Sequence, residues 1–137
     1  ERALLKQSQL LVTKPVLYCA NVPEADLANP NANPHYQRLA ARAAEEGRSL
    51  VAISAQIEAE LSQLEGPERQ DYLASLGVSS SGVDNLIKTT FDALGLKTYF
   101  TAGEKEVRAW PFPQGFSAPQ CAGIIHSDFE NGFIRAE

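Results

Sequence analysis

The chain has 137 residues, of which 44% are hydrophobic and 21% are charged, and its formal net charge is −5. This composition is typical of a globular protein with one domain or parts of two, and the acidic balance argues against binding nucleic acid mainly by counterion release. Apolar runs are far shorter than the roughly 20 residues that cross a bilayer. We therefore expect a cytoplasmic protein with neither membrane nor DNA as a partner. Cys19 and Cys121 lack metal-binding spacing, which predicts two buried free thiols.

The first part of the chain has the pattern of a strand–helix–strand unit. Residues 1–11 read as the end of a helix without a start signal, which suggests that a longer helix precedes them. The apolar run 15–20 predicts a strand buried on both faces, and residues 49–54 predict a second strand. Between them, apolar residues at helical spacing over 34–47 predict an amphipathic helix. The two strands should therefore be parallel.

The rest of the chain predicts more helices and then a change to β structure. Helical spacing is found over residues 55–64, 66–76 and 83–94, with Ser81 and Asp84 as a weak capping box before the last of these. Residues 97–100 and 107–112 are rich in aromatic and β-branched side chains around a Gly-containing turn, which predicts a hairpin. Residues 120–129 then predict a helix, and residues 133–136 predict the start of a strand.

Polar side chains follow both predicted parallel strands at their carboxyl ends, where ligands bind in sheets of this kind. Asn21, Val22 and Glu24 lie at the end of the first strand, and Ser54 and Ala55 lie at the end of the second. An Asn amide offers a donor and an acceptor to a purine, a carboxylate accepts from its N–H groups, and backbone N–H groups of residues 54 and 55 would close the pocket. The same Asn-x-x-Glu spacing is also typical of loop capping with an exposed acid.

Four stretches resemble the YchF family of Obg-related nucleotide hydrolases. They are residues 18–24 (YCANVPE), 54–60 (SAQIEAE), 96–110 (LKTYFTAGEKEVRAW) and 118–137 (APQCAGIIHSDFENGFIRAE). The resemblance covers essentially the whole chain, in order. It implies an α/β fold in which a partial Rossmann-like P-loop NTPase domain is followed by a partial α+β β-grasp (TGS) domain. Residues 1–11 would end a helical insertion, 12–95 would form the C-terminal half of the nucleotide domain, and 96–137 would open the TGS domain.

The resemblance also implies functional roles. Asn21 and Glu24 would read the base, Val22 would provide an apolar seat for it, and Ser54 with Ala55 would form the second base-side loop. The family accepts ATP as well as GTP and uses Mg²⁺. Its TGS domain is associated with RNA and ribosome contact. The chain contains no Gly-x-x-x-x-Gly-Lys-Ser/Thr, so the Mg²⁺ ligands are not in this chain and it is expected not to hydrolyse nucleotide by itself.

The alternative is an RNA- or ribosome-binding module with a vestigial nucleotide site. Lys97, Lys105 and Arg108 lie near aromatic residues in the predicted hairpin, and cations beside aromatic rings suit single-stranded RNA. Glu58 and Glu60 are expected to be solvated acids because residues two apart on a helix point apart. His126 is expected to be a hydrogen-bonded structural residue.

Overall fold

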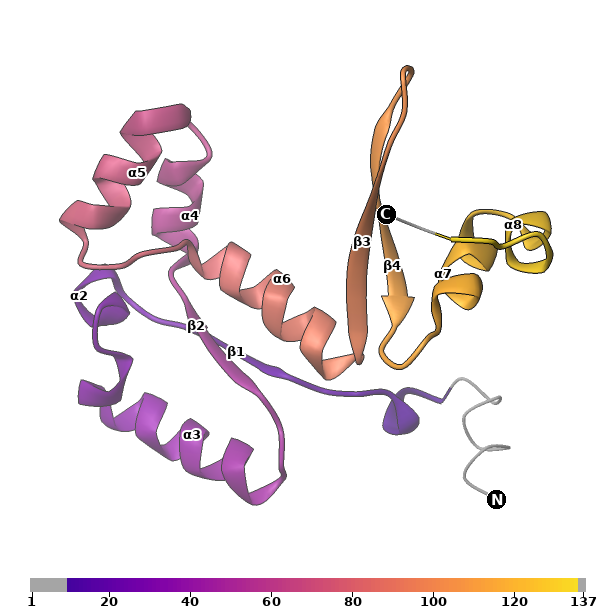
Figure 1. Cartoon of the computed structure of the whole chain (residues 1–137). Coiled ribbons are helices and arrows are strands. Elements are labelled where there is room, and N and C mark those ends of the chain that lie inside the picture. Colours follow the sequence, from indigo (N-terminus) through magenta and orange to yellow (C-terminus); the bar gives the residue numbers. More distant parts are fainter. Residues whose placement is uncertain (1–9, 136–137) are drawn as a thin grey trace. The chain divides into compact units, whose positions relative to one another are not determined.

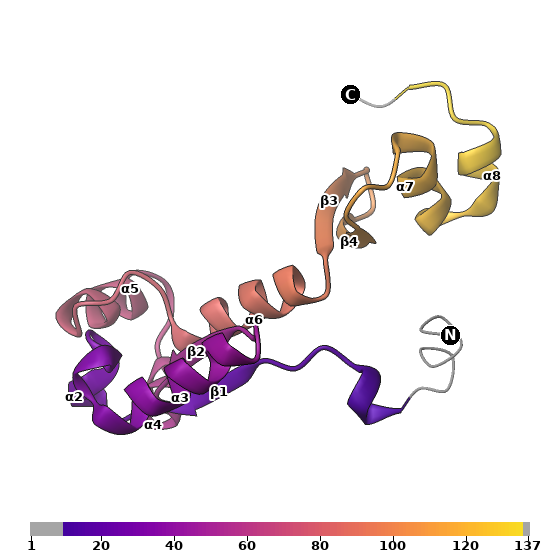
Figure 2. The ribbon, with the colours of Figure 1, turned by 90° about the horizontal axis from the view of Figure 1, so that it is seen from below.

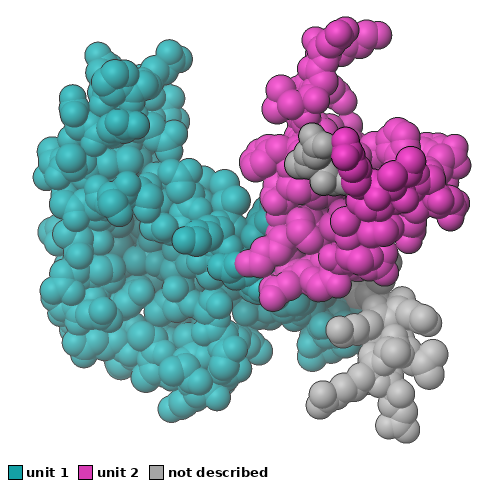
Figure 3. Space-filling view, viewed as in Figure 1, with its two compact units in different colours: residues 1–93 teal, residues 94–137 magenta. Residues whose placement is uncertain are grey.

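The computed structural model describes residues 10–135. The chain divides into two compact units, Glu1–Ala93 and Leu94–Glu137, which Figure 3 colours separately. Most of the helix end expected over residues 1–11 lies outside the described residues. Beyond it, Leu11–Thr13 forms a short 3-10 helix, η1.

Two parallel strands form the sheet of the first unit. β1 (Tyr18–Asn21) pairs with β2 (Leu50–Ile53), with Tyr18 opposite Leu50 and Asn21 opposite Ile53. The chain between them contains α3 (Pro34–Glu45), which begins where Asn33 accepts hydrogen bonds from the N–H groups of His35 and Tyr36. Figures 1 and 2 show α3 on one side of the strand pair and α6 (Gly82–Ala93) on the other. The predicted parallel pair with an intervening helix is confirmed.

The burial predicted for the first strand is wrong. Along β1 the half-buried Tyr18 and Ala20 alternate with the exposed Cys19 and Asn21. Successive side chains of a strand point to opposite faces, so one face of β1 is open in the described part of the chain. Cys19 is consequently an exposed free thiol, whereas Cys121 is a half-buried one.

A small helical layer follows the carboxyl ends of the strands and contains the buried core. It consists of α2 (Glu24–Leu27), the 3-10 helix η2 (Pro30–Ala32), α4 (Ala55–Leu61) and α5 (Gly66–Ser75). Ile57, Leu61 and Leu73 are its buried centre, with Leu27, Tyr72, Leu76 and Val78 packed around them. The sequence pattern predicts α4 and α5 but not α2 or η2, because Asn and Pro give that stretch the composition of a loop.

Glu60 is exposed, as expected of a solvated acid, and it also connects α4 to α5. Its carboxylate accepts a hydrogen bond from the Tyr72 hydroxyl and another from Gln56. The bond to Tyr72 lowers the pKa of Glu60 and raises the pKa of Tyr72 to about 12. The neutral phenol and the charged carboxylate are therefore the paired forms near neutral pH.

The start of α6 is held from several directions. Ser81, which is 1% exposed, accepts a hydrogen bond at Oγ from the N–H of Asp84, as the Ser half of the predicted capping box requires. Arg69 of α5 donates to the same Oγ at 3.3 Å and lies 3.6 Å from the Asp84 carboxylate. The beginning of α6 is thus linked to α5.

The second unit is a hairpin followed by two short helices. β3 (Leu96–Ala102) pairs antiparallel with β4 (Val107–Pro113), which confirms the predicted hairpin. α7 (Ala118–Ile125) and α8 (Ser127–Asn131) come next. Residues 133–135 have no regular secondary structure, so the strand expected from 133 is not present in the described residues.

The single helix predicted over residues 120–129 is wrong because the chain breaks at His126. This residue has extended backbone angles (φ −161°, ψ 143°), and its ring Nδ1 accepts a hydrogen bond from the N–H of Asp128 at 3.2 Å. A Cβ added at Gly123 would lie 3.1 Å from Cβ of Glu130, so α8 folds back closely over α7 at this glycine. His126 therefore has the structural hydrogen bond that was expected, as a helix cap.

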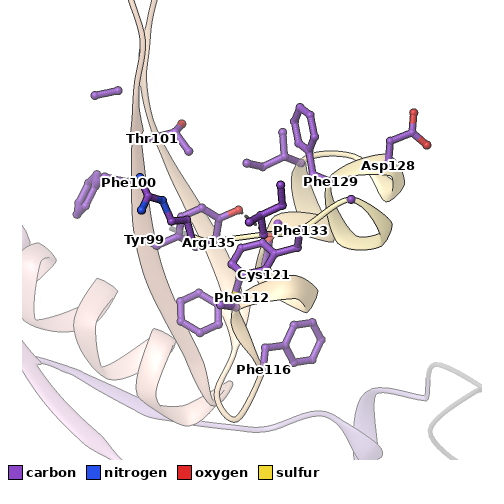
Figure 4. A pocket seen from close by; sticks show the side chains of 16 residues that line it. Tyr99, Phe100, Thr101, Phe112, Phe116, Cys121, Asp128, Phe129, Phe133 and Arg135 are labelled. Carbon is purple, nitrogen blue, oxygen red and sulfur yellow. Dashed lines mark hydrogen bonds between the residues drawn. The ribbon is translucent and has the colours of Figure 1, made fainter. Parts of the chain in front are cut away.

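An apolar groove lies between the hairpin and these helices. Its lining includes Tyr99 and Phe112 of the hairpin, Phe129 of α8 and Phe133 after it (Figure 4). The Tyr99 hydroxyl donates to the carbonyl of Cys121 at 2.8 Å, and burial raises the pKa of Tyr99. The groove has a volume of about 870 Å³.

Candidate functional site at the strand ends

The parallel register brings the two polar strand ends side by side. Asn21 is the partner of Ile53, and the N–H of Val22 donates to the carbonyl of Ile53 at 2.7 Å. Ser54 follows the last residue of β2 and is the N-cap residue of α4. The segments that contain the predicted site residues, 21–24 and 54–55, therefore share the carboxyl edge of the sheet, which we call the rim.

Asn21 and Ala55 are in direct contact across this edge. The side-chain Oδ1 of Asn21 accepts a hydrogen bond from the backbone N–H of Ala55 at 3.0 Å. Only the oxygen of an amide accepts hydrogen bonds, so this contact fixes which way the Asn21 amide is turned. Asn21 is exposed, and among the hydrogen bonds of the described residues none uses its Nδ2. The group left for a ligand is a donor.

This contact changes the expected roles of the second loop. The N–H of Ala55 was expected to close the pocket, but Asn21 already occupies it. Ser54 is 2% exposed, and its carbonyl accepts from the N–H of Glu58 at 2.9 Å within α4. In the structure, the N–H of Ala55 thus holds the Asn21 amide, while Ser54 is buried before the first turn of α4.

Val22 lines a small pocket next to Asn21, although its side chain is only 6% exposed. The pocket has a volume of about 250 Å³ and extends from the end of β1 to the start of α3, where Tyr36 and Leu39 complete its apolar wall. Glu24, Ser54 and Ala55 do not line it. Val22 therefore borders this pocket, but most of its surface is covered.

Glu24 is the first residue of α2 and is exposed. Its charge contributes to raising the pKa of Tyr72, after the larger contributions of the Glu60 hydrogen bond and burial. The negative charge of Glu24 is therefore near enough to Tyr72 of α5 to act on its hydroxyl. Glu24 remains an exposed acceptor three residues after Asn21 in the sequence.

Glu58 connects α4, which follows the rim, to the beginning of α6, and the sequence pattern did not predict this contact. Its Oε1 accepts hydrogen bonds from the N–H groups of Gly82 at 2.6 Å and Val83 at 3.3 Å, at the beginning of α6. The prediction that Glu58 is a solvated acid is therefore wrong. The sequence indicates only that a helix starts near residue 82, and that its first backbone N–H groups require hydrogen-bond acceptors. It does not indicate which residue provides them.

The predicted RNA-facing side chains lie in the hairpin of the second unit. The Arg108 guanidinium lies over the ring of Trp110, 4.0 Å from its centroid, and Trp110 Nε1 donates to Thr101 Oγ1 at 2.9 Å. Lys97 is opposite Phe112 in β3, and Lys105 lies in the turn between the strands. Arg108 and Trp110 thus form an ordered pair of a cation and an aromatic ring.

Neither a metal centre nor a membrane span is found in the described part of the chain. No group of three or more His, Cys, Asp or Glu residues is placed to hold an ion there. No helix among residues 10–135 is both long enough and apolar enough to cross a bilayer.

Parallel strands with flanking helices define a mixed α/β protein. Its polar rim lies at the carboxyl ends of the strands, where such sheets usually bind ligands. Residues 96–137 match the family model YchF-GTPase_C, described as a protein of unknown function (DUF933). The chain is 53% identical over 137 residues to the ribosome-binding ATPase YchF of Bacillus subtilis. The aligned region covers 100% of the chain and 37% of that protein. It is 49% identical to the protein of the same name from Mycoplasma pneumoniae, over 97% of the chain and 37% of that protein.

A solved structure agrees with these relatives. The YchF GTPase of Schizosaccharomyces pombe matches 96% of the chain and 35% of its own length, with a TM-score of 0.79 and 34% sequence identity. The resemblance to the YchF family is therefore confirmed, and the chain is homologous to YchF proteins along its whole length. It spans about 37% of the length of the curated relatives that it matches.

Proposed function

We propose that this segment supplies the base-recognising part of a P-loop nucleoside triphosphatase that uses ATP or GTP and associates with the ribosome in the cytoplasm. The relatives are named ribosome-binding ATPases, and the matching solved structure is named a GTPase. In this proposal residues 12–95 form the C-terminal half of the nucleotide domain. Residues 96–137 open a TGS domain, which is consistent with a hairpin followed by a helix.

The observation that carries the proposal is the hydrogen bond between Asn21 and Ala55. Because it occupies Oδ1, it leaves the NH₂ group of Asn21 to a ligand at an exposed strand end. Adenine and guanine both have a ring N7 that accepts hydrogen bonds. A donor at this point suits either purine and does not discriminate between them. Discrimination in this proposal comes from Glu24, which accepts from ring and exocyclic N–H groups.

Hydrolysis is assigned to a full-length protein and not to this segment. The 137 residues contain no Gly-x-x-x-x-Gly-Lys-Ser/Thr sequence. Phosphoryl transfer depends on such a loop and on Mg²⁺ to position the phosphates and neutralise their charge. The segment by itself is accordingly proposed to be inactive, with the Mg²⁺ ligands lying elsewhere in the full-length protein.

Replacement of Glu24 by alanine tests base recognition. In a full-length protein that carries this segment, we expect Glu24→Ala to weaken GTP binding about tenfold more than ATP binding, since guanine offers the carboxylate two N–H donors and adenine one amino group. The measurements are the Kd of each nucleotide by calorimetry and the rates of ATP and GTP hydrolysis. Glu45→Ala, which removes an exposed acid at the end of α3, is the control. Absence of any ATP or GTP hydrolysis by the unaltered full-length protein would overturn the enzyme assignment.

A second candidate function, an RNA- or ribosome-binding module with a vestigial nucleotide site, is favoured by the stacking of Arg108 on Trp110. A cation held over an aromatic ring suits contact with phosphate and an unpaired base. Under this alternative, Lys105→Ala and Arg108→Ala each weaken ribosome association by about fivefold, from the loss of a phosphate contact. Co-sedimentation with ribosomes measures this, and Lys88→Ala is the control.

The two candidates differ in their response to Glu24→Ala. A vestigial nucleotide site predicts that this variant changes neither nucleotide binding nor ribosome association. A changed preference between ATP and GTP favours the hydrolase. If Lys105→Ala and Arg108→Ala sediment with ribosomes as the unaltered protein does, the hairpin is not the ribosome-contacting surface.

A further inference from the structure

The carboxylate of Glu58 joins two helices that are far apart in the sequence. Its Oε1 accepts from the backbone N–H groups of Gly82 and Val83, at 2.6 Å and 3.3 Å. The first N–H groups of a helix have no partner within the helix, and a negative charge at this end is favoured by the helix dipole. Glu58 thus fixes α4 to the beginning of the 12-residue helix α6.

The beginning of α6 is itself held against the end of β2. Gly82 is buried, and a Cβ added to it would lie 2.8 Å from Cγ2 and 3.0 Å from Cα of Ile53. This approach allows only a glycine, so the backbone of α6 rests directly on the last residue of the strand. The carbonyl of Ile53 in turn accepts from the N–H of Val22. The anchor of Glu58 is therefore a packed part of the sheet edge.

The contacts that begin at α6 and pass through Glu58 and α4 end at the Asn21 amide. Ala55 and Glu58 are three residues apart in α4, so they lie on neighbouring positions of the same helix surface. The N–H of Ala55 turns the Asn21 amide so that its NH₂ group is the one available. The direction of that N–H depends on where α4 begins, and Glu58 fixes the first turn of α4 to α6.

From this arrangement we infer that Glu58 is a positioning residue for purine recognition: through the first turn of α4 it holds the Asn21 amide in the orientation that donates to the purine N7. The inference rests on the proposed function of the rim. Glu58 does not touch the base. Its loss loosens the first turn of α4, the Asn21 amide is then free to turn, and the contact to N7 weakens for adenine and guanine alike.

7-Deaza-ATP, in which N7 is replaced by a C–H group, isolates this contact. In a full-length protein carrying the segment, we expect ATP to bind about fivefold more tightly than 7-deaza-ATP, which is the effect of one hydrogen bond. Glu58→Ala is expected to weaken ATP and GTP by about fivefold each and to leave the Kd of 7-deaza-ATP unchanged. The two changes are then non-additive, as expected for groups that act on one interaction.

Two further variants separate positioning from a general loss of structure. Glu58→Gln keeps an acceptor for Gly82 and should retain at least half of the ATP affinity. Glu60→Ala removes the acid two residues further on, which bonds to Tyr72 of α5, and should bind all three nucleotides as the unaltered protein does. A variant that merely unfolds loses affinity for 7-deaza-ATP as well.

The outcomes distinguish this inference from the proposed function. If the unaltered protein binds neither ATP nor GTP, or binds ATP no better than 7-deaza-ATP, the proposed base contact itself fails. If it prefers ATP to 7-deaza-ATP but Glu58→Ala weakens both equally or neither, base recognition stands and the positioning role of Glu58 is refuted.

Discussion

Asn21→Ala is expected to weaken the binding of both ATP and GTP by about fivefold in a full-length protein that carries this segment. The change removes the donor to the purine and leaves the N–H of Ala55 without its partner. Loss of the donor corresponds to about 1 kcal/mol, or about fivefold in Kd, whereas the loss of the Ala55 partner is the same with and without nucleotide and lowers the stability of the fold instead. The Kd of each nucleotide, measured by calorimetry, gives the result. Because N7 is common to the two purines, the ratio of the two affinities should stay the same.

Asn21→Asp separates the two losses. The aspartate retains an acceptor for the N–H of Ala55 but presents an oxygen where the NH₂ group was, so binding should be at least as weak as in Asn21→Ala while the edge of the sheet stays intact. Asn29→Ala, at an exposed position before η2, is the control. Unaltered nucleotide affinity in Asn21→Asp would refute the assignment of Asn21 as a donor.

The strand pair and its shared edge could be predicted because their signals are local. An apolar run, a helix with a regular period and a second apolar run suffice to indicate parallel strands, and parallel strands end at the same edge. The contacts that give this edge its chemistry have no such signal. The hydrogen bond from Ala55 to Asn21 spans 34 residues, and that from Gly82 to Glu58 spans 24. Side-chain contacts over these separations leave no periodicity in a sequence.

The break at His126 shows a related limit of sequence patterns. Residues on both sides of it have helical spacing, so the pattern predicts one helix. The chain turns because α8 packs onto α7 at Gly123, and the His126 ring then caps the new helix. Histidine is not among the usual capping residues, which are Ser, Thr, Asp and Asn. The sequence therefore has no usual capping residue at position 126 to indicate that a second helix starts after it.

Ile57→Ala is expected to produce the largest loss of stability, about 2–5 kcal/mol in the free energy of unfolding, because it leaves a cavity in the core of the helical layer. Ile57 is fully buried, at 0% exposure, beside Leu61 and Leu73. Urea denaturation followed by circular dichroism measures the change, and hydrogen exchange of the α4 and α5 peptides localises it. Ile87→Ala, the same substitution at a side chain that is 53% exposed in α6, should cost less than about 1 kcal/mol.

The same variant tests how the core and the rim are connected. Ile57 lies in α4 between Ala55, which holds Asn21, and Glu58, which holds α6. Opening of the core at Ile57 disturbs the whole helical layer in addition to these two contacts, so Ile57→Ala should weaken 7-deaza-ATP as well as ATP and GTP. Glu58→Ala, by contrast, should leave 7-deaza-ATP unaffected. If Ile57→Ala and Ile87→Ala reduce stability equally, the buried cluster of α4 and α5 is not the core that supports the rim.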